Sequence, residues 1–508
     1  MRIPRLPTLI FALVLAAAAW RLWRSPHGAG DLEIGPDSIE YTVAAGRFVD
    51  HQGYNLLIDG VTYPPRYTPW FSIGLLAPAI LLARGELGAA ILPVFGLSLL
   101  AVAAGFGIGR RVAGDWGAAI AAMALLVNPV FATMARVVMS DVPALAFGLA
   151  ACLVYLRSEP RRADPLFAGL LAAGGGALRV ECLAILIPFA WRYRRSATAL
   201  ALLAGPPLAV AAATDWYNAR TFGGWLRSGY DYWCPVPYEV PGLTFGLRYA
   251  ALNLERLFTM PRVGLALFGA AGAAILWARR REAVRPALRY LALAALPGTL
   301  LHLVYFYPET RFHLFVLAAA SILGGAALGS LAHTLARGRL WPILPAIVLT
   351  AALVPASPPR TPPYRRIAAE TMARETPPDA VIISGLDPVF LSPYLLRDAS
   401  RIIVPASRSI EYADKLVAPY RIGPLDPPPN GPHDHRARGL LRYGALDPCP
   451  LVATEARELI PRWLASGRRV FLDAGYLPGD APLERILDPA VVVVPNPRAR
   501  WLGELRLR

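Results

Sequence analysis

Charged residues are scarce in this sequence, and lysine is almost absent from it. Only 17% of the 508 residues are charged, whereas 55% are hydrophobic, and the mean hydropathy is +0.42. These proportions exclude a single water-soluble domain, in which about a quarter of the residues would be charged. The sequence therefore predicts a polytopic membrane protein. Lys415 is the only lysine, a bias of composition to which we attach no mechanism.

Cysteine is also rare, with four residues that show no metal-ligand spacing. The formal net charge of +16 would favour a nucleic-acid partner in a soluble protein. Here, however, the arginines cluster in short loops between apolar runs, as cytoplasmic loops of membrane proteins do. We therefore predict a membrane partner and no nucleic-acid partner.

A membrane-spanning helix needs about 17–25 apolar residues, and about 11 stretches are candidates. The stretches are 7–23, 88–109, 115–135, 142–156, 165–179, 181–192, 197–214, 262–278, 287–305, 312–333 and 340–356.

Two stretches leave the topology open, because 165–192 can form one long helix and 68–84 can span the membrane instead of lying on its surface. Basic loops favour cytoplasmic locations. The basic loops all face the cytoplasm when 165–192 forms two short spans and 68–84 is a surface helix. We therefore predict a cytoplasmic N-terminus, a large external loop over 24–87, and an external segment after about residue 357.

The composition changes near residue 357, where prolines are followed by a water-compatible segment. Short apolar runs there predict buried strands separated by helices. The strands are expected at 381–383, 402–404, 470–472 and 491–494, and the helices near 364–375 and 453–466. We predict a transmembrane domain over 1–356 and a small soluble periplasmic α/β domain over 357–508.

The external loop after the first span carries a candidate general base. Asp37 follows Pro36 at a predicted helix start, so its carboxylate lies in the first turn, where the helix dipole favours a negative charge. Glu40 and Tyr41 follow one turn later on the same face. A carboxylate there can take a proton from a hydroxyl or amine acceptor. A capping aspartate with no other role is the alternative.

Other ionisable residues lie near the ends of predicted spans, where burial in hydrocarbon costs about 2.5–3.5 kcal/mol each unless a substrate or a partner charge offsets it. Asp141 is one of them. Arg311 stands near Tyr307 at an external end and can bind a lipid-linked phosphate, although an interfacial arginine is the alternative. For Arg179 and Glu181, a structural ion pair is the favoured interpretation.

Several of these features follow one another along the chain in an order and spacing that are typical of one family. They are an acidic residue after the first span, Pro64-Pro65 before a surface helix, Asn128-Pro129, Ser140-Asp141-Val142-Pro143, and Leu178-Arg179-Val180-Glu181. In this order and spacing, the sequence over about 1–355 resembles the GT-C glycosyltransferases that use polyprenyl-phosphate sugars. The resemblance is strongest to the bacterial branch related to protein O-mannosyltransferases and lipid A aminoarabinose transferases.

The resemblance implies a GT-C fold with surface helices in the first external loop, and a catalytic centre at Asp37 with Asp141 beside it. It also implies transfer of a hexosyl or pentosyl group from a polyprenyl-phosphate-linked sugar to a lipid, glycan or protein acceptor at the periplasmic face of the bacterial inner membrane. The predicted substrate-binding residues are Glu40, Tyr41, Tyr63, Arg179, Glu181, Tyr307 and Arg311. Tyr63 stands where many relatives have lysine or histidine.

The residues make no cofactor certain, and Asp37 and Asp141 together suit a divalent cation, so the sequence leaves metal dependence open. The main alternative is a transporter or lipid flippase, in which the same charges line a pathway through the membrane. An inactive scaffold that presents the 357–508 domain is a third interpretation. The sequence does not identify the sugar or the acceptor.

Overall fold

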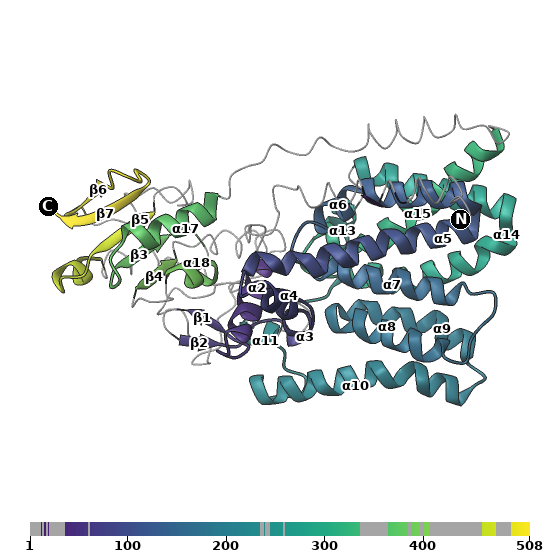
Figure 1. Ribbon diagram of the computed structural model, residues 1–508, viewed down its shortest axis with the longest axis horizontal. Coiled ribbons are helices and arrows are strands. Elements are labelled where there is room, and N and C mark those ends of the chain that lie inside the picture. Colours follow the sequence, from purple (N-terminus) through teal and green to yellow (C-terminus); the bar gives the residue numbers. More distant parts are fainter. Residues whose placement is uncertain are drawn as a thin grey trace. The chain divides into compact units, whose positions relative to one another are not determined.

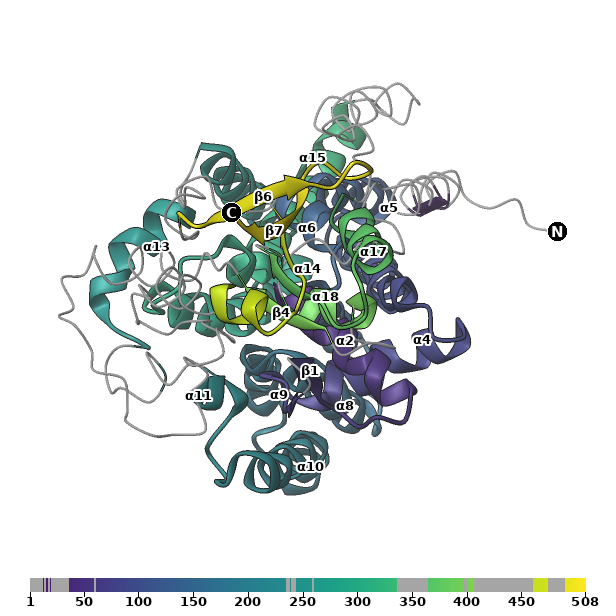
Figure 2. The same ribbon diagram turned by 90° about the vertical axis from the view of Figure 1, so that its left-hand side faces the viewer.

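The computed structural model divides the chain into two compact units (Figures 1 and 2). The first unit comprises Met1–Ala29, Gly88–Thr214 and Phe245–Thr361, and the second comprises Gly30–Leu87, Asp215–Thr244 and Pro362–Arg508. The structure describes residues 36–58, 61–233, 238, 244–257, 260–335, 364–384, 386, 388–395, 401–405, 460–473 and 489–508, and also residues 12, 15, 16 and 19.

The first unit is helical. Its helices are α5 (Ile91–Val127), α6 (Pro129–Met134), α7 (Asp141–Tyr155), α8 (Asp164–Leu178), η3 (Val180–Ile185), α9 (Leu186–Tyr193), α10 (Ala197–Phe222), η4 (Leu247–Tyr249), α13 (Ala250–Leu257), α14 (Met260–Leu303), η5 (Thr310–His313) and α15 (Leu314–Leu335). The last turns of α10 belong to the second unit.

Helix α5 contains a turn at Gly114, which divides it into two arms. Gly114 has a φ of 79°, a conformation that glycine adopts at little cost. A Cβ atom on Gly109 would lie only 2.7 Å from the Cβ of Ala121, so the two arms pack side by side. These arms correspond to the predicted spans 88–109 and 115–135.

The segment 165–192 is also divided, as the favoured topology predicts. Arg179 is extended, with φ −150° and ψ 115°, and it separates α8 from η3. A Cβ on Gly176 would lie 2.5 Å from the Leu183 side chain, so the two pieces fold against each other. The prediction of two short helices in place of one long helix is therefore confirmed.

Four helical stretches among the described residues are long and apolar enough to cross a membrane. They are Leu87–Val127, Ala197–Phe222, Arg262–Leu303 and Thr310–Thr334. The third stretch is broken at Arg280, as α5 is at Gly114. It therefore accounts for the two predicted spans 262–278 and 287–305. Helices α7 and α8 are shorter apolar helices. The predicted span 340–356 lies outside the described residues. Of the predicted span 7–23, only residues 12, 15, 16 and 19 are described.

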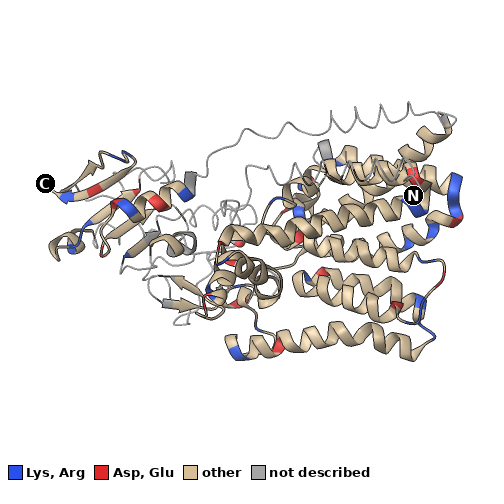
Figure 3. Ribbon diagram, in the orientation of Figure 1, with Lys and Arg blue, Asp and Glu red and all other residues tan. Residues whose placement is uncertain are grey.

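Three basic loops of the first unit meet at the C-terminal end of α7. Arg111 and Arg192 donate hydrogen bonds to the backbone carbonyls of Leu156 and Tyr155, and Arg157 forms an ion pair with Asp164. Figure 3 shows arginine gathered at this end of the helices. Three of the loops that the charge pattern assigns to one side of the membrane therefore lie together.

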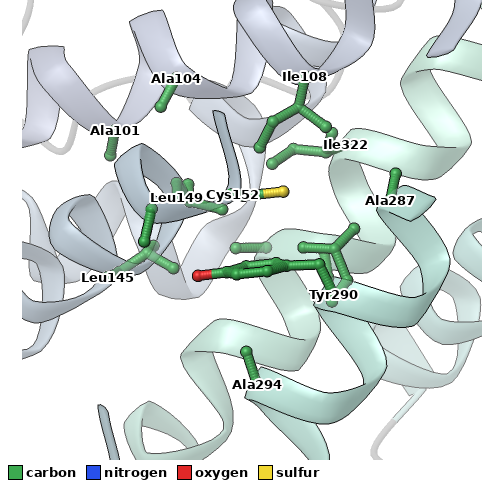
Figure 4. Close-up of a cluster of buried hydrophobic side chains, with 14 of the residues drawn as sticks. Ala101, Ala104, Ile108, Leu145, Leu149, Cys152, Ala287, Tyr290, Ala294 and Ile322 are labelled. Carbon is green, nitrogen blue, oxygen red and sulfur yellow. The ribbon is translucent and has the colours of Figure 1, made fainter. Parts of the chain in front are cut away.

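The core of the first unit is built from small side chains on α5 and α7 around a tyrosine of α14 (Figure 4). Tyr290 is fully buried, and its hydroxyl donates a hydrogen bond to the Gly148 carbonyl at 2.8 Å. Ile322 of α15 reaches the same cluster. Close helix packing through alanine and glycine is typical of membrane helices, because lipid supplies no hydrophobic drive for their association.

The second unit contains a five-stranded sheet in the order β4-β3-β5-β7-β6. Its strands are β3 (Val381–Ser384), β4 (Ile402–Pro405), β5 (Val470–Asp473), β6 (Val491–Pro495) and β7 (Leu502–Leu507). Strand β3 pairs in parallel with β4 and β5, while β7 is antiparallel to β5 and β6. Four strands match the predicted runs, and the sequence analysis missed β7.

Helices cover both faces of this sheet, as parallel strands require. Ile382 and Phe471 face the core that contains α17 (Tyr364–Glu375) and α18 (Pro388–Leu395). Their neighbours Val381 and Val470 point the other way, toward the helical residues 460–465. The small α/β domain predicted after residue 357 is present. The predicted boundary at 356/357 lies outside the described residues.

The core of the sheet domain extends into the first external loop. Here lie α2 (Pro36–Val49), the hairpin β1 (Leu56–Ile58) and β2 (Val61–Tyr63), and the short helices α3 (Pro69–Phe71), η1 (Ser72–Leu76) and α4 (Ala77–Leu82). Ile39 and Val43 of α2 are buried in one cluster with Leu391 of α18. Pro69–Leu82, like α7 and α8, is a shorter apolar helix, and its place on the membrane surface stays a prediction.

Replacement of Leu391 by alanine tests this shared core. Leu391 is 0% exposed, so we expect Leu391→Ala to lower the free energy of unfolding by about 2–5 kcal/mol, measured from the thermal midpoint of the purified protein. Ile367→Ala is the matched control, since Ile367 of α17 is 46% exposed. An equal effect of the two substitutions would contradict this description of the core.

Candidate active site

The first external loop brings two carboxylates and one arginine together within the second unit. Arg66 Nη2 lies 2.7 Å from Asp37 Oδ1 and 3.2 Å from Glu40 Oε2. The backbone N–H of Arg66 also donates a hydrogen bond to Glu40 Oε1. The exposed fractions of the three side chains are 12% for Arg66, 16% for Asp37 and 9% for Glu40. The result is a compact and largely buried charge cluster.

Local sequence explains the placement of this cluster. Helix α2 starts at Pro36, which suits a first helical position, and Asp37 lies in the first turn as predicted. Glu40 is one turn further along, while Ile39 and Val43 turn an adjacent face of α2 toward the core. The Pro64-Pro65 pair precedes Arg66 and stiffens the segment that carries it back to α2.

Tyrosine rings surround the Arg66 guanidinium. Its central carbon lies 4.7 Å from the ring centroid of Tyr67 and 5.6 Å from that of Tyr230 on α11 (Gly229–Trp233). Arg66 Nη2 donates a hydrogen bond to the Tyr67 hydroxyl at 2.9 Å. Tyr41 stacks on Tyr67 with ring centroids 4.2 Å apart. Cation–π contacts of this kind stabilise a charged guanidinium at a partly desolvated position.

The electrostatic environment keeps Arg66 charged and Tyr67 neutral. Burial alone would lower the pKa of Arg66, but Tyr67, Glu40 and Asp37 together raise it well above its ordinary value. Burial raises the pKa of Tyr67 well above its ordinary value, although the nearby Arg66 opposes this shift. The cluster therefore carries a permanent positive charge between two carboxylates.

Gly229, the first residue of α11, allows this helix to approach the cluster. A Cβ atom at Gly229 would lie 2.2 Å from the Arg66 carbonyl oxygen, so Gly229→Ala must displace α11 or the Arg66 segment. We expect it to cost about 1–3 kcal/mol of stability, seen as a lower thermal midpoint. Gly74→Ala is the control, because nothing lies within 4 Å of a Cβ there. A Gly229→Ala protein as stable as this control would contradict the close approach.

A second charge cluster lies within the first unit, at the ends of α7 and α8. Arg179 Nη1 is 2.8 Å from Asp141 Oδ1, and Arg179 Nε is 2.5 Å from Glu181 Oε1. Arg311 Nη1 lies 3.9 Å from Asp141 Oδ2. The Asp141 side chain is 1% exposed, so two arginines compensate a buried carboxylate. The predicted ion pair between Arg179 and Glu181 is present.

Phe312 links the two arginines of this second cluster. Its ring centroid is 5.1 Å from the Arg179 guanidinium carbon and 5.3 Å from that of Arg311. His302 stacks on the same ring, with centroids 4.5 Å apart, and its Nδ1 lies 2.8 Å from the Gly298 carbonyl oxygen. Because a carbonyl only accepts, Nδ1 carries a proton.

The structure places the predicted site residues in three settings. Asp37, Glu40 and Tyr41 belong to the second unit's cluster, whereas Asp141, Arg179, Glu181 and Arg311 belong to that of the first unit. Tyr63 packs into the core of the second unit and is 8% exposed. Tyr307 is half-buried, with its ring centroid 6.1 Å from that of Phe306. The proximity of Asp37 to Asp141 stays a prediction.

Sequence reasoning missed Arg66, Tyr67, Tyr230, His302 and Phe312 as members of these clusters. One signal for Arg66 was available, because it is the basic residue of the segment that also holds Pro64-Pro65. Its carboxylate partners, however, lie 26 and 29 residues earlier in the chain. No local pattern joins residues so far apart.

Comparisons with known proteins identify the fold. No protein-family model matches the sequence, and no curated protein sequence matches it. ArnT from Cupriavidus metallidurans, in a structure bound to undecaprenyl phosphate, superposes with a TM-score of 0.60 at 14% identity over 97% of each chain. Its apo structure gives 0.58 over the same shares. The apo oligosaccharyltransferase of Archaeoglobus fulgidus gives 0.50 at 14% identity, over 93% of this chain and 72% of that one.

These similarities and the helical architecture define the protein as a polytopic membrane protein with a GT-C fold and a small C-terminal α/β domain. ArnT, a lipid A aminoarabinose transferase, and the oligosaccharyltransferase both belong to the GT-C superfamily. The fold that the sequence motifs predict is therefore confirmed.

Proposed function

We propose that this protein is a glycosyltransferase that moves a sugar from a polyprenyl-phosphate donor to a lipid, glycan or protein acceptor. The observation that carries the proposal is the carboxylate of Asp37, held by Arg66 in the first turn of α2 on a GT-C fold. The donor class is supported by the undecaprenyl phosphate bound to ArnT. We place the reaction at the periplasmic face of a bacterial inner membrane, with the N-terminus in the cytoplasm.

The reaction proceeds in a single displacement. Asp37 takes the proton from the acceptor hydroxyl or amine as the acceptor atom attacks the anomeric carbon. The bond between that carbon and the lipid phosphate oxygen breaks, and the phosphate leaves with both bonding electrons. We assign stabilisation of the negative charge on the leaving phosphate to Arg311 and Arg179, which lie around Asp141 in the first unit. That they reach the same sugar as Asp37 stays a prediction. One displacement inverts the anomeric configuration.

The distribution of charge favours this function over transport. Asp141 opens α7, Arg179 follows α8, and Arg311 lies in η5 just before α15, so these groups stand at helix ends. Beyond Asp141 the sequence of α7 contains no charged residue, and α15 contains only His333 as an ionisable group. A transport pathway would need polar groups along the interior of the spans.

The test is reconstitution of the purified protein in liposomes with polyprenyl-phosphate sugars. Mass spectrometry of envelope glycans and lipid-linked sugars in a deletion strain selects the donor and the acceptor to be tested. We expect a new glycosidic product together with free polyprenyl phosphate. Movement of the lipid-linked sugar across the bilayer without a product would instead support the flippase alternative.

A further inference from the structure

Arg66 occupies the space between the two carboxylates of α2. One atom, Nη2, approaches Asp37 Oδ1 to 2.7 Å and Glu40 Oε2 to 3.2 Å, while the Arg66 backbone N–H donates to the second oxygen of Glu40. Two carboxylates one helical turn apart repel each other unless a positive charge lies between them. In this cluster the positive charge is supplied by the chain itself.

The residues present do not fit a divalent cation at this position. Such a cation takes about six to eight oxygen ligands with lone pairs directed at it, whereas a guanidinium carries only N–H donors. Asp141, the other carboxylate that the sequence suggested as a ligand, is engaged by Arg179 at 2.8 Å. Over the described residues, no group of three or more histidine, cysteine, aspartate or glutamate side chains is arranged to hold a metal ion.

We infer that Arg66 takes the place of a divalent cation between Asp37 and Glu40, and that sugar transfer by this protein does not require such a cation. The inference rests on the proposed function. Arg66 acts as a positioning residue: it holds the Asp37 carboxylate in one direction and compensates one of the two negative charges on α2. One net negative charge is left for accepting the proton of the acceptor substrate.

The surroundings of Arg66 are built to keep the guanidinium in place. Tyr67 accepts a hydrogen bond from Nη2, and the rings of Tyr67 and Tyr230 lie 4.7 and 5.6 Å from its central carbon. The close contact of Gly229 with the Arg66 backbone fixes the segment from the other side. A lysine ammonium supplies the positive charge, but it lacks the planar guanidinium that lies beside the rings of Tyr67 and Tyr230.

The first experiment measures metal dependence in the lipid-reconstituted wild-type protein. We expect the transfer rate after dialysis against EDTA to stay within about twofold of the rate with added millimolar MgCl2 or MnCl2. We also expect elemental analysis to find far less than one equivalent of divalent metal per chain. A rate that falls after EDTA and returns with Mg²⁺ or Mn²⁺ would overturn the inference and leave the proposed function standing.

The second experiment replaces the guanidinium. Arg66→Ala should lower kcat by about 100-fold, since misplacing a reacting group by about 1 Å has this effect. Millimolar ethylguanidinium should restore part of the rate, and Arg66→Lys should retain more activity than Arg66→Ala. Arg84→Ala, a change at an exposed residue of the same unit, is the control and should neither lose activity nor respond to ethylguanidinium.

The outcomes separate the two proposals. A folded Arg66→Ala protein with the wild-type rate, or one that ethylguanidinium does not rescue, would overturn the role of Arg66. If Arg66→Ala does not fold, the metal measurements on the wild-type protein and the rate of Arg66→Lys still decide the question. A wild-type protein that transfers no sugar from any polyprenyl-phosphate donor, with or without metal, would instead refute the proposed function.

Discussion

Asp37→Asn should lower the rate constant for sugar transfer by about 100-fold to 10,000-fold, the range that a general base contributes. The amide has the size and shape of the carboxylate and can still accept a hydrogen bond from Arg66. It cannot accept a proton, because its nitrogen lone pair is delocalised. The loss should therefore appear in kcat, measured in liposomes with a polyprenyl-phosphate sugar.

Asp50→Asn is the matched control for this substitution. Asp50 follows the end of α2 and is exposed, so the same chemical change there should leave the rate unchanged. Full activity of Asp37→Asn would reject Asp37 as the base. In that case Asp37 would be left with the capping role that local sequence also allows.

Arg179→Met should produce the largest loss of stability among the charged residues discussed. The Asp141 side chain is 1% exposed and has its shortest ion pair, 2.8 Å, with Arg179. Removing Arg179 leaves Asp141 with the longer, 3.9 Å contact to Arg311. It also takes an ion-pair partner from Glu181, and loss of one partner of a buried pair costs about 3–5 kcal/mol. The thermal midpoint of the detergent-purified protein measures the effect. Methionine keeps much of the length of arginine, so packing changes little.

The double substitution Arg179→Met with Asp141→Leu distinguishes charge burial from loss of packing. Replacing both partners of a buried pair by apolar side chains is often nearly neutral, so part of the lost stability should return. The rest stays lost, because Glu181 has also lost Arg179. Arg366→Met is the external control. Its partner Glu370 is 47% exposed, and such pairs contribute only a few tenths of a kcal/mol to about 1 kcal/mol. A double variant no more stable than Arg179→Met would refute the electrostatic explanation.

The sheet shows how far the sequence predicts the soluble part. Strands β3, β4 and β6 begin in runs of valine and isoleucine, and β5 begins with Val470-Phe471-Leu472. Such apolar runs indicate buried strands by themselves. Strand β7 was missed because Glu504 and Arg506 interrupt its apolar residues. Glu504 lies opposite Phe471 and forms an ion pair with Arg469 of the neighbouring segment at 2.6 Å. The strand depends on partners that a local pattern does not contain.

The topology around Arg179 was predictable for a different reason. Hydropathy alone left one long helix and two short helices equally open over 165–192, and the arginines of the flanking loops chose between them. The structure shows what divides the segment, namely an extended Arg179 held by Asp141 and Glu181. The arginines of the flanking loops predicted that the segment is divided. The ion pairs of Arg179 with Asp141 and Glu181 explain why the division falls at Arg179.

The sequence by itself determined the class of this protein, its main apolar helices, the strands of its sheet except β7, and the position of Asp37 in the first turn of α2. These properties follow from composition and from patterns within about 20 residues, because hydropathy and the chemistry of helix ends depend on residues that are close together in the sequence. Only the tertiary structure decided that Arg66 lies between Asp37 and Glu40, and that α2 shares a core with α18. Charge pairing and core packing act through space, between residues that are distant along the chain.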